Sequence, residues 1–176
     1  MEPDDFELMV DIETFGRDNR STILSVGVTV FSEYRSDPKH DTFYTTLPLQ
    51  PQLDKGRTVD AKTIHWWLGQ EEEIPLELGN DMITSLGNLY TFLMAHKGRK
   101  VWAHGTTFDI IKLETLFSDF GYDTPWDYWN IMDCRTVTNL INCRSKSNNH
   151  NALDDAINQA QWILDAKAVL KDRGVS

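Results

Sequence analysis

The chain has 176 residues, and 27 acidic against 17 basic side chains give it a formal net charge of −10. This length fits one domain at the usual ~100–200 residues per domain, and 40% hydrophobic with 25% charged residues predicts a packed core rather than disorder. The negative charge disfavours a protein that coats duplex DNA through a broad basic surface. A small substrate, a protein partner or a metal site built from carboxylates remains open.

Cysteine spacing and hydropathy bear on the compartment. Cys134 and Cys143 lie nine residues apart, which matches no zinc-binding spacing, so we expect reduced thiols. The acidic first ten residues lack the basic region of a signal peptide, and the longest apolar stretch, residues 23–31, is far shorter than the ~20 residues of a membrane span. We therefore expect a cytoplasmic protein without membrane contact, built as a single domain over residues 1–176.

Apolar runs separated by polar turns dominate the first third of the chain. Three strands are expected there, over residues 6–12, 23–31 and 43–47. The polar turn at residues 16–21 is short, so the first two strands should pair antiparallel. Pro48 and Pro51 then interrupt the pattern.

From residue 60 onward the apolar residues recur at helical spacing, and short apolar strands alternate with helices. A short helix begins after Asp60, which is a suitable N-cap. Longer helices are expected over residues 80–96, 107–120 and 151–171, with short strands over 100–103 and 131–132. This order predicts an α/β fold with a mixed sheet, antiparallel in its first strands and then parallel, flanked by helices on both faces.

An acidic pair ends the first strand. Asp11 and Glu13 project from the same face, because side chains alternate along a strand. If the two carboxylates are buried, they repel each other and cost several kcal/mol unless they are paired or bind a metal. The alternative is that the strand simply runs out into solvent there.

Two further acidic segments lie where helices begin. Asp109 falls in the first turn of a helix, where the helix dipole favours an acid even without a metal. Asn151 and the acid three residues later resemble a capping box, which leaves Asp155 without a capping role, and His150 lies just outside that cap. Four carboxylates and one histidine at strand and helix ends suit a single site at one edge of an α/β sheet.

The three segments also resemble known motifs. DIET at residues 11–14, HGTTFD at 104–109 and HNALDD at 150–155 are similar, in this order, to the three exonuclease motifs of DEDDh 3′–5′ exonucleases in the ribonuclease-H-like superfamily. ILSVG at 23–27 and Thr-x-x-Trp-Trp at 63–67 resemble the branch around exodeoxyribonuclease VIII, phage exonuclease A and the mycobacterial exoribonuclease-like domain. The resemblance extends from residue 6 to about residue 170.

The resemblance implies a metal-dependent 3′–5′ exonuclease that releases 5′-mononucleotides from single-stranded 3′ ends of RNA or DNA. It implies two divalent cations, Mg²⁺ with Mn²⁺ as a substitute, which prefer oxygen ligands. Asp11, Glu13 and Asp155 would bind the cation that activates water, and Asp11 would bridge to a second one, which Asp109 reaches mainly through water. His150 would be the general base, since a histidine of ordinary pKa ~6.5 accepts a proton near neutral pH.

Substrate contacts are expected from five side chains near the motifs: Thr14, Phe15, Trp66, Trp67 and Arg135. Phe15 is the first candidate to stack on a terminal base, with packing on the core as the alternative. Trp66 and Trp67 point ~100° apart on a helix, so we expect one to be packed and the other to line the substrate groove. Arg135 contacts either a phosphate or Asp133.

Other aromatic and basic residues are assigned more simply. Trp102 and Phe108 are expected in the core. Four basic residues are expected to guide one strand toward the site: Arg17, Arg20, Arg57 and Lys62.

Two other functions stay open from the sequence. A metal-dependent endonuclease on the same fold would cut a circular substrate, whereas a non-catalytic module that binds nucleic acid or protein would release no nucleotides. The choice between RNA and DNA stays open as well, because recognition of the 2′-hydroxyl depends on contacts that no motif reports. The resemblance also allows a homodimer.

Overall fold

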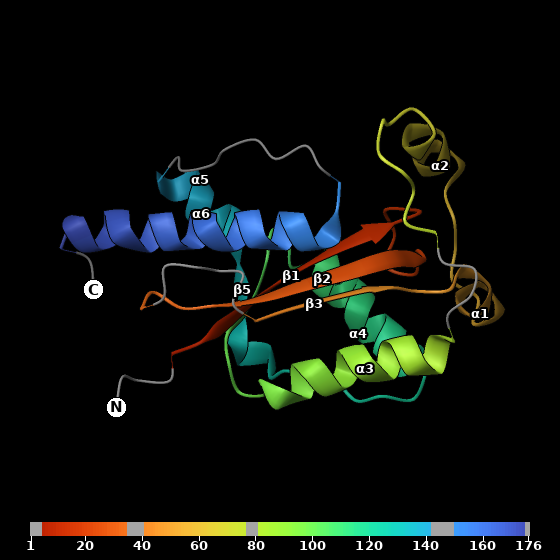
Figure 1. Cartoon of the computed structure of the whole chain (residues 1–176), viewed down its shortest axis with the longest axis horizontal. Helices are drawn as coiled ribbons and strands as arrows, with labels where there is room; N and C mark the ends of the chain where they lie inside the picture. Colours follow the sequence, from red (N-terminus) through yellow and green to blue (C-terminus); the bar gives the residue numbers. More distant parts are fainter. Residues whose placement is uncertain (1–4, 35–40, 77–80, 142–149, 175–176) are drawn as a thin grey trace.

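The computed structural model describes residues 5–34, 41–76, 81–141 and 150–174, and at its centre lies one five-stranded sheet (Figure 1). The strand order is β3-β2-β1-β4-β5. The strands are β1 (Glu7–Thr14), β2 (Ile23–Phe31), β3 (Asp41–Thr46), β4 (Val101–Ala103) and β5 (Ile131–Asp133). β1, β2 and β3 pair antiparallel, whereas β4 pairs parallel with both β1 and β5. The predicted mixed sheet, antiparallel first and then parallel, is confirmed.

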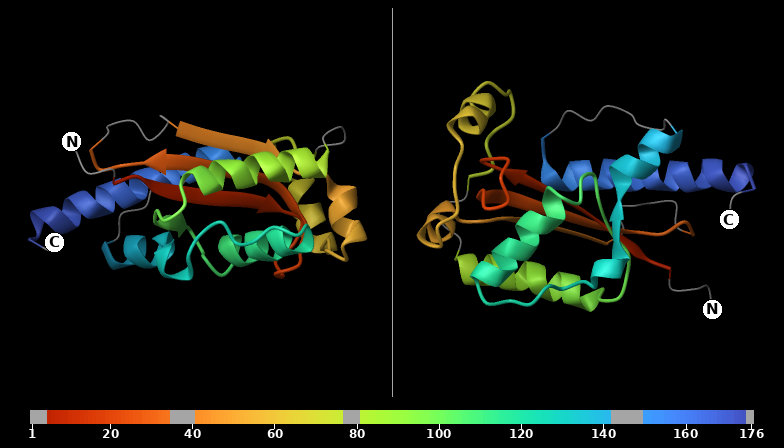
Figure 2. Two further views of the ribbon diagram at one scale, coloured as in Figure 1. Left: turned by 90° about the horizontal axis from the view of Figure 1, so that it is seen from below. Right: turned by 180° about the vertical axis from the view of Figure 1, so that it is seen from behind.

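Helices cover both faces of this sheet (Figures 1 and 2). The longer ones are α3 (Met82–Ala95), α4 (Asp109–Asp119) and α6 (Ala152–Asp172), and the shorter ones are α1 (Leu49–Asp54), α2 (Ala61–Trp67), η1 (Tyr128–Asn130) and α5 (Cys134–Ile141). α6 packs on one face, and α3 and α4 pack on the other. The expected α2, α3, α4 and α6 are confirmed, although the predicted first residue of α3, residue 80, lies outside the described part. The short helices α1 and α5 were not expected.

Side-chain alternation along β1 divides the core into two layers. Leu8, Val10 and Ile12 are buried against α3 and α4, whereas Met9 is buried in the cluster that includes α6. By the same alternation, Asp11 and Glu13 point toward α6. The acidic end of β1 therefore faces the first turns of α6. The first and third acidic motifs, residues 11–14 and 150–155, are thus brought together.

Two smaller expectations concern the compartment. Within the part of the chain that the structure describes, no helix is both long and apolar enough to cross a membrane. Cys134 is a buried free thiol, and Cys143 lies outside the described residues.

Candidate active site

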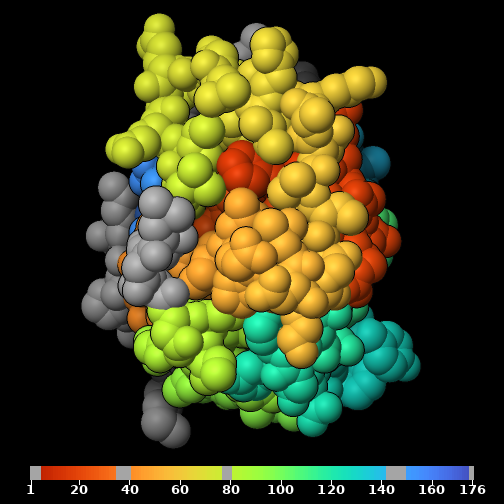
Figure 3. All heavy atoms as spheres, turned by 90° about the vertical axis from the view of Figure 1, so that its right-hand side faces the viewer, coloured from red at the N-terminus to blue at the C-terminus, as the bar shows by residue number. Residues whose placement is uncertain are grey.

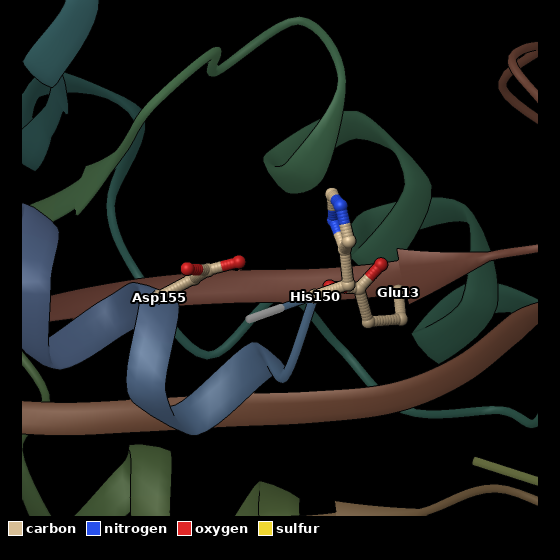
Figure 4. Close-up of side chains that lie close together, drawn as sticks. All are labelled: Glu13, His150 and Asp155. Carbon is tan, nitrogen blue, oxygen red and sulfur yellow. The ribbon is translucent and has the colours of Figure 1, made fainter. Parts of the chain in front are cut away.

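The carboxyl end of β1, the N-terminal end of α6 and α2 meet at one edge of the sheet (Figure 1). Figure 3 views the molecule from this side, where red atoms of the N-terminal part lie between the yellow atoms around α2 and the orange atoms nearer α1. Glu13, His150 and Asp155 each offer one ligand atom here, and these atoms lie within 4.8 Å of one another. In Figure 4, Glu13 extends from β1 and Asp155 from the first turns of α6. His150 lies just before Asn151, the N-cap residue of α6.

A glycine on β2 allows α6 to approach the sheet this closely. Gly27 pairs with Asp11, and a Cβ at Gly27 would lie 2.3 Å from the backbone carbonyl of Ala152. Such a distance is too short for any side chain, so only glycine fits. Asn151 then caps α6, because its Oδ1 accepts from the backbone N–H groups of Leu153 and Asp154 at 3.0 and 3.2 Å. The close approach and the cap together fix the turn that carries Asp155.

Asp11 and Asp109 form the buried part of the site. Their side chains are 9% and 5% exposed. Burial raises the pKa of Asp11 well above its usual value, and repulsion from Asp109 is the next largest cause, which places the two carboxylates near each other. Burial also raises the pKa of Asp109 to about 7, although backbone groups such as the Gly105 N–H and the charge of Lys112 act against this shift.

Glu13 connects the buried acids with Asp155. Burial, followed by repulsion from Asp155 and Asp109, raises the pKa of Glu13 to about 8. Burial and neighbouring carboxylates are thus the causes that raise the pKa of both Glu13 and Asp11. Lys112 offsets part of the negative charge at Asp109, and the four crowded carboxylates are the hard oxygen donors that Mg²⁺ and Mn²⁺ prefer, so this donor set fits divalent cations.

His150 has an unusual backbone conformation. Its φ is 42°, and among the described residues it is the only non-glycine residue with a positive φ. Its ring lies edge-on to Trp66, with ring centroids 4.8 Å apart. A left-handed conformation costs a residue with a Cβ free energy, and such strain is concentrated at functional sites. In this conformation a ring nitrogen of His150 lies within 4.8 Å of ligand atoms of Glu13 and Asp155.

A cavity of about 660 Å³ opens beside Glu13. Three aromatic side chains line it: Trp66 and Trp67 from α2, and Phe108 at the start of α4. Two exposed basic residues, Arg17 and Lys62, belong to the same lining. The cavity therefore combines ring faces with positive charge, next to the acidic cluster.

The sequence of the chain matches one protein-family model. Residues 6–166 match the model of the 3′-5′ exoribonuclease Rv2179c-like domain. The chain belongs to this family. No curated protein sequence matches the chain closely enough to count as a relative. A 3′-5′ exonuclease domain family accounts for the three motifs and for the carboxylates gathered at the end of β1.

Solved structures of other nucleases share the fold of this Rv2179c-like chain. A full-length 3′-exonuclease has 10% identity and a TM-score of 0.52, covering 97% of this chain and 62% of that one. E. coli ExoI, in the metal-free form of its complex with single-stranded DNA, has 15% identity and a TM-score of 0.59, covering 96% and 40%. S. pombe Pop2p, in its Mg²⁺- and Mn²⁺-bound form, has 11% identity and a TM-score of 0.52, covering 91% and 82%. The chain thus spans less than two thirds of the first two proteins, and at these identities the likeness establishes the ribonuclease-H-like fold.

Of the three aromatic residues predicted to contact substrate, one is exposed and two are buried. Trp66 is 43% exposed, whereas Trp67 is 1% exposed and donates its indole N–H to the Thr14 carbonyl at 3.0 Å. The expectation that one of the two tryptophans is packed is confirmed for Trp67, and the contact of Trp66 with substrate stays a prediction. The prediction that Phe15 stacks on a base is wrong, because its ring is 5% exposed and packs against Leu24 and Trp67.

Thr14 and Arg135 lie near the site in different ways. Thr14 lines the cavity, but its hydroxyl already donates to the Gly16 carbonyl at 2.8 Å. Arg135 is exposed on α5, and one guanidinium nitrogen would lie 3.0 Å from a Cβ at Gly105. The Asp133 carboxylate accepts hydrogen bonds from the backbone N–H groups of Thr106 and Thr136. Contacts of Thr14 and Arg135 with substrate remain predictions.

Of the four basic residues expected to guide a strand, Arg57 cannot do so. Its side chain is fully buried, donating to the Ser21 carbonyl and pairing with Asp119 at 3.0 Å. Arg20 pairs with the same Asp119 at 3.1 Å, away from the cavity lining. Arg57 therefore fastens the β1–β2 connection to α4, and Arg17 and Lys62 are the basic residues of the set that line the cavity.

Three residues at the site were not predicted from the sequence. Phe108 was expected in the core, but its partly buried ring also lines the cavity. Lys112 is fully buried, with its ammonium 3.3 Å from the Phe108 ring centroid and donating to the Arg17 carbonyl at 3.2 Å. Gln159 donates to Asp11. The signal for the last two was their helical spacing, Lys112 three residues after Asp109 and Gln159 four after Asp155.

Proposed function

We propose that this chain is a single-domain 3′–5′ exonuclease over residues 1–176, which hydrolyses phosphodiester bonds from single-stranded 3′ ends and releases 5′-mononucleotides. One observation carries the proposal: four carboxylates and a histidine converge at the end of β1, beside a cavity with aromatic and basic walls. Membership of a 3′-5′ exonuclease domain family supports the same activity.

The carboxylates hold the metal in this proposal. Asp11, Glu13 and Asp155 would hold one divalent cation, and Asp11 and Asp109 would hold a second. Two divalent cations supply charge stabilisation for the attacking and leaving oxygens of the phosphate. Mg²⁺ is the expected ion, with Mn²⁺ as a substitute, and the Mg²⁺- and Mn²⁺-bound form of S. pombe Pop2p supports this choice.

His150 moves the proton. Its ring accepts a proton from the attacking water, whose oxygen bonds to phosphorus while the bond from phosphorus to the 3′ oxygen of the preceding nucleotide breaks. The 3′ oxygen takes up a proton, and the terminal residue leaves as a 5′-mononucleotide. The edge-on contact with Trp66 and the left-handed backbone hold the imidazole beside Glu13 and Asp155 while it does so.

The cavity receives the terminal nucleotide. Its volume of about 660 Å³ admits one nucleotide, and the exposed ring of Trp66 together with Phe108 offers faces on which a base can stack. Arg17 and Lys62 attract the phosphates of the strand. Arg135 and Thr14 are further candidate contacts at the edge of the site.

The substrate is a single strand of RNA or DNA. The family's description names exoribonucleases, which favours RNA, whereas the E. coli ExoI structure contains single-stranded DNA. The acidic net charge of −10 agrees with a transient hold on one end rather than with binding along a duplex.

The decisive test is a digestion series with 5′-labelled single-stranded RNA and DNA in Mg²⁺, in Mn²⁺ and in EDTA. We expect stepwise shortening from the 3′ end, release of mononucleotides and complete loss of activity in EDTA. Cutting of a circular single strand would indicate an endonuclease instead. No cleavage of any substrate by protein that binds the strands would indicate a non-catalytic binding module.

Two variants test the assigned roles. His150→Ala should lower turnover by about 10²- to 10⁴-fold while Mn²⁺ still binds, because a general base is lost and the carboxylates remain. Asp155→Ala should lose Mn²⁺ affinity in calorimetry. Asp154→Ala removes the neighbouring, exposed acid of the same turn and serves as the matched control. Near-normal turnover of His150→Ala would overturn its role.

A further inference from the structure

One polar side chain at the site has no role in the chemistry described so far. Gln159 on α6 is 5% exposed, and its Nε2 donates to Oδ1 of Asp11 at 2.8 Å. Among the described residues it is the only side chain that hydrogen-bonds to the Asp11 carboxylate. Its own Oε1 has no hydrogen-bond partner within the described residues.

The position of Gln159 follows from the way α6 runs along β1. The helix starts near the carboxyl end of the strand and runs back antiparallel to it (Figure 1). Two strand residues advance about 6.6 Å and four helix residues about 6.0 Å, so successive inward positions stay in register. Glu13 faces Asp155 at the first step, and Asp11 faces Gln159 at the next.

The amide is poorly explained by stability alone. A buried amide with an unpaired oxygen costs free energy, whereas an apolar residue of similar volume would extend the neighbouring core of Met9, Ala160 and Ile163 without that cost. A lysine or arginine at this position would pair with Asp11 and compete with a bound cation for its oxygens. A neutral donor orients the carboxylate without replacing the cation.

We propose that Gln159 is a positioning residue for Asp11: it holds one carboxylate oxygen, fixes the rotation of the group and leaves the other oxygen for a divalent cation. The inference rests on the proposed function, because it assumes that Asp11 is a metal ligand. Gln159 acts through Asp11, the group to which its Nε2 donates.

The test measures Mn²⁺ binding by titration calorimetry on the full chain, with Gln159→Met compared to wild type. We expect an affinity about 10- to 100-fold weaker, the usual effect of losing a group that orients a ligand. The unfolding midpoint in EDTA, followed by circular dichroism, should show that the variant is folded. Gln161→Met is the matched control, since Gln161 is exposed on the same helix and its side chain donates to Asp165 instead of Asp11.

A double-mutant cycle tests whether the effect passes through Asp11. In an Asp11→Asn background, Gln159→Met should not weaken Mn²⁺ binding further, because the carboxylate that it orients is absent. A further tenfold loss in that background would overturn the inference. If Gln159→Met does not fold, Gln159→Asn keeps the amide but shortens its reach, and the same loss of affinity is expected.

Steady-state kinetics separate this inference from the proposed function. At saturating Mn²⁺, Gln159→Met should recover most of the wild-type kcat with an unchanged KM for the strand, because the cation deficit is overcome by concentration. Unchanged Mn²⁺ affinity in a folded, active variant would overturn the role of Gln159 alone. Wild-type protein that binds no Mn²⁺ and releases no nucleotides would overturn the proposed function itself.

Discussion

The raised pKa of Glu13 predicts how the stability of the metal-free protein depends on pH. The ordinary glutamate value is 4.5, and in the folded protein burial and the charges of Asp155 and Asp109 raise it to about 8. Between these values the folded state binds one proton more than the unfolded state. The free energy of unfolding therefore falls as pH rises, at about 1.4 kcal/mol per pH unit for this group. The stabilising contribution is complete below pH 4.5 and lost by about pH 8.

The substitution Glu13→Gln isolates this contribution, since the amide has nearly the same shape and does not titrate. Integrated from pH 5.5 to 7.5, the loss attributable to Glu13 is about 2.5 kcal/mol. Urea unfolding in EDTA at pH 5.5, 6.5 and 7.5 should thus show the variant gaining about 2.5 kcal/mol relative to wild type. Glu72→Gln, which removes an exposed glutamate, should give a constant difference at all three values. Parallel curves for wild type and Glu13→Gln would refute the reasoning.

Three other predictions follow from the same geometry. Mn²⁺ binding at pH 7 should release protons, because Glu13 and Asp109 have pKa values of about 8 and 7, and calorimetric heats that do not depend on the buffer would contradict this. Gly27→Ala should cost about 1–3 kcal/mol in thermal unfolding and weaken Mn²⁺ binding, since its Cβ would force α6 away from the sheet. Trp66→Ala should raise the KM for a single strand by about 5- to 150-fold and also lower kcat, because the ring that holds His150 is lost, whereas Trp129→Ala, which removes an exposed ring in η1, should leave both unchanged.

The sequence was sufficient for most of the fold because local pattern and tertiary packing agree there. The alternating apolar residues of β1 and the capping residues Asp60 and Asn151 have the roles that the pattern predicts. The helix α1 was not predicted, because Pro51 was expected to interrupt regular structure. Pro51 lies in the first turn of α1, where a backbone N–H has no partner within the helix, so its absence costs no hydrogen bond. Asp133 marks the start of α5 by accepting from the Thr136 N–H at 2.7 Å, a local signal that could have been used.

The directions of individual side chains were harder to predict. The strand register shifts between Glu13 and Thr14, so alternation no longer fixes the direction of the next residue. Phe15 consequently turns into the cluster with Leu24 and Trp67, while Phe108 from a distant segment faces the cavity. Which aromatic ring meets a cavity depends on this long-range packing, and no local pattern carries that information.

The same electrostatics explain how a marginally stable domain can bury so many acids. In the metal-free protein, protons reduce the repulsion, because the pKa values of Asp11, Glu13 and Asp109 are all raised. Each bound proton neutralises a buried carboxylate and so removes part of the repulsion. A divalent cation that displaces the proton relieves the same repulsion. The acidic cluster is therefore least stable where it is fully charged and empty of cations, which ties folding stability and cation affinity to the same carboxylates. Removing one acid should stabilise the metal-free fold and weaken cation binding together, a relation opposite to that of an ordinary core residue.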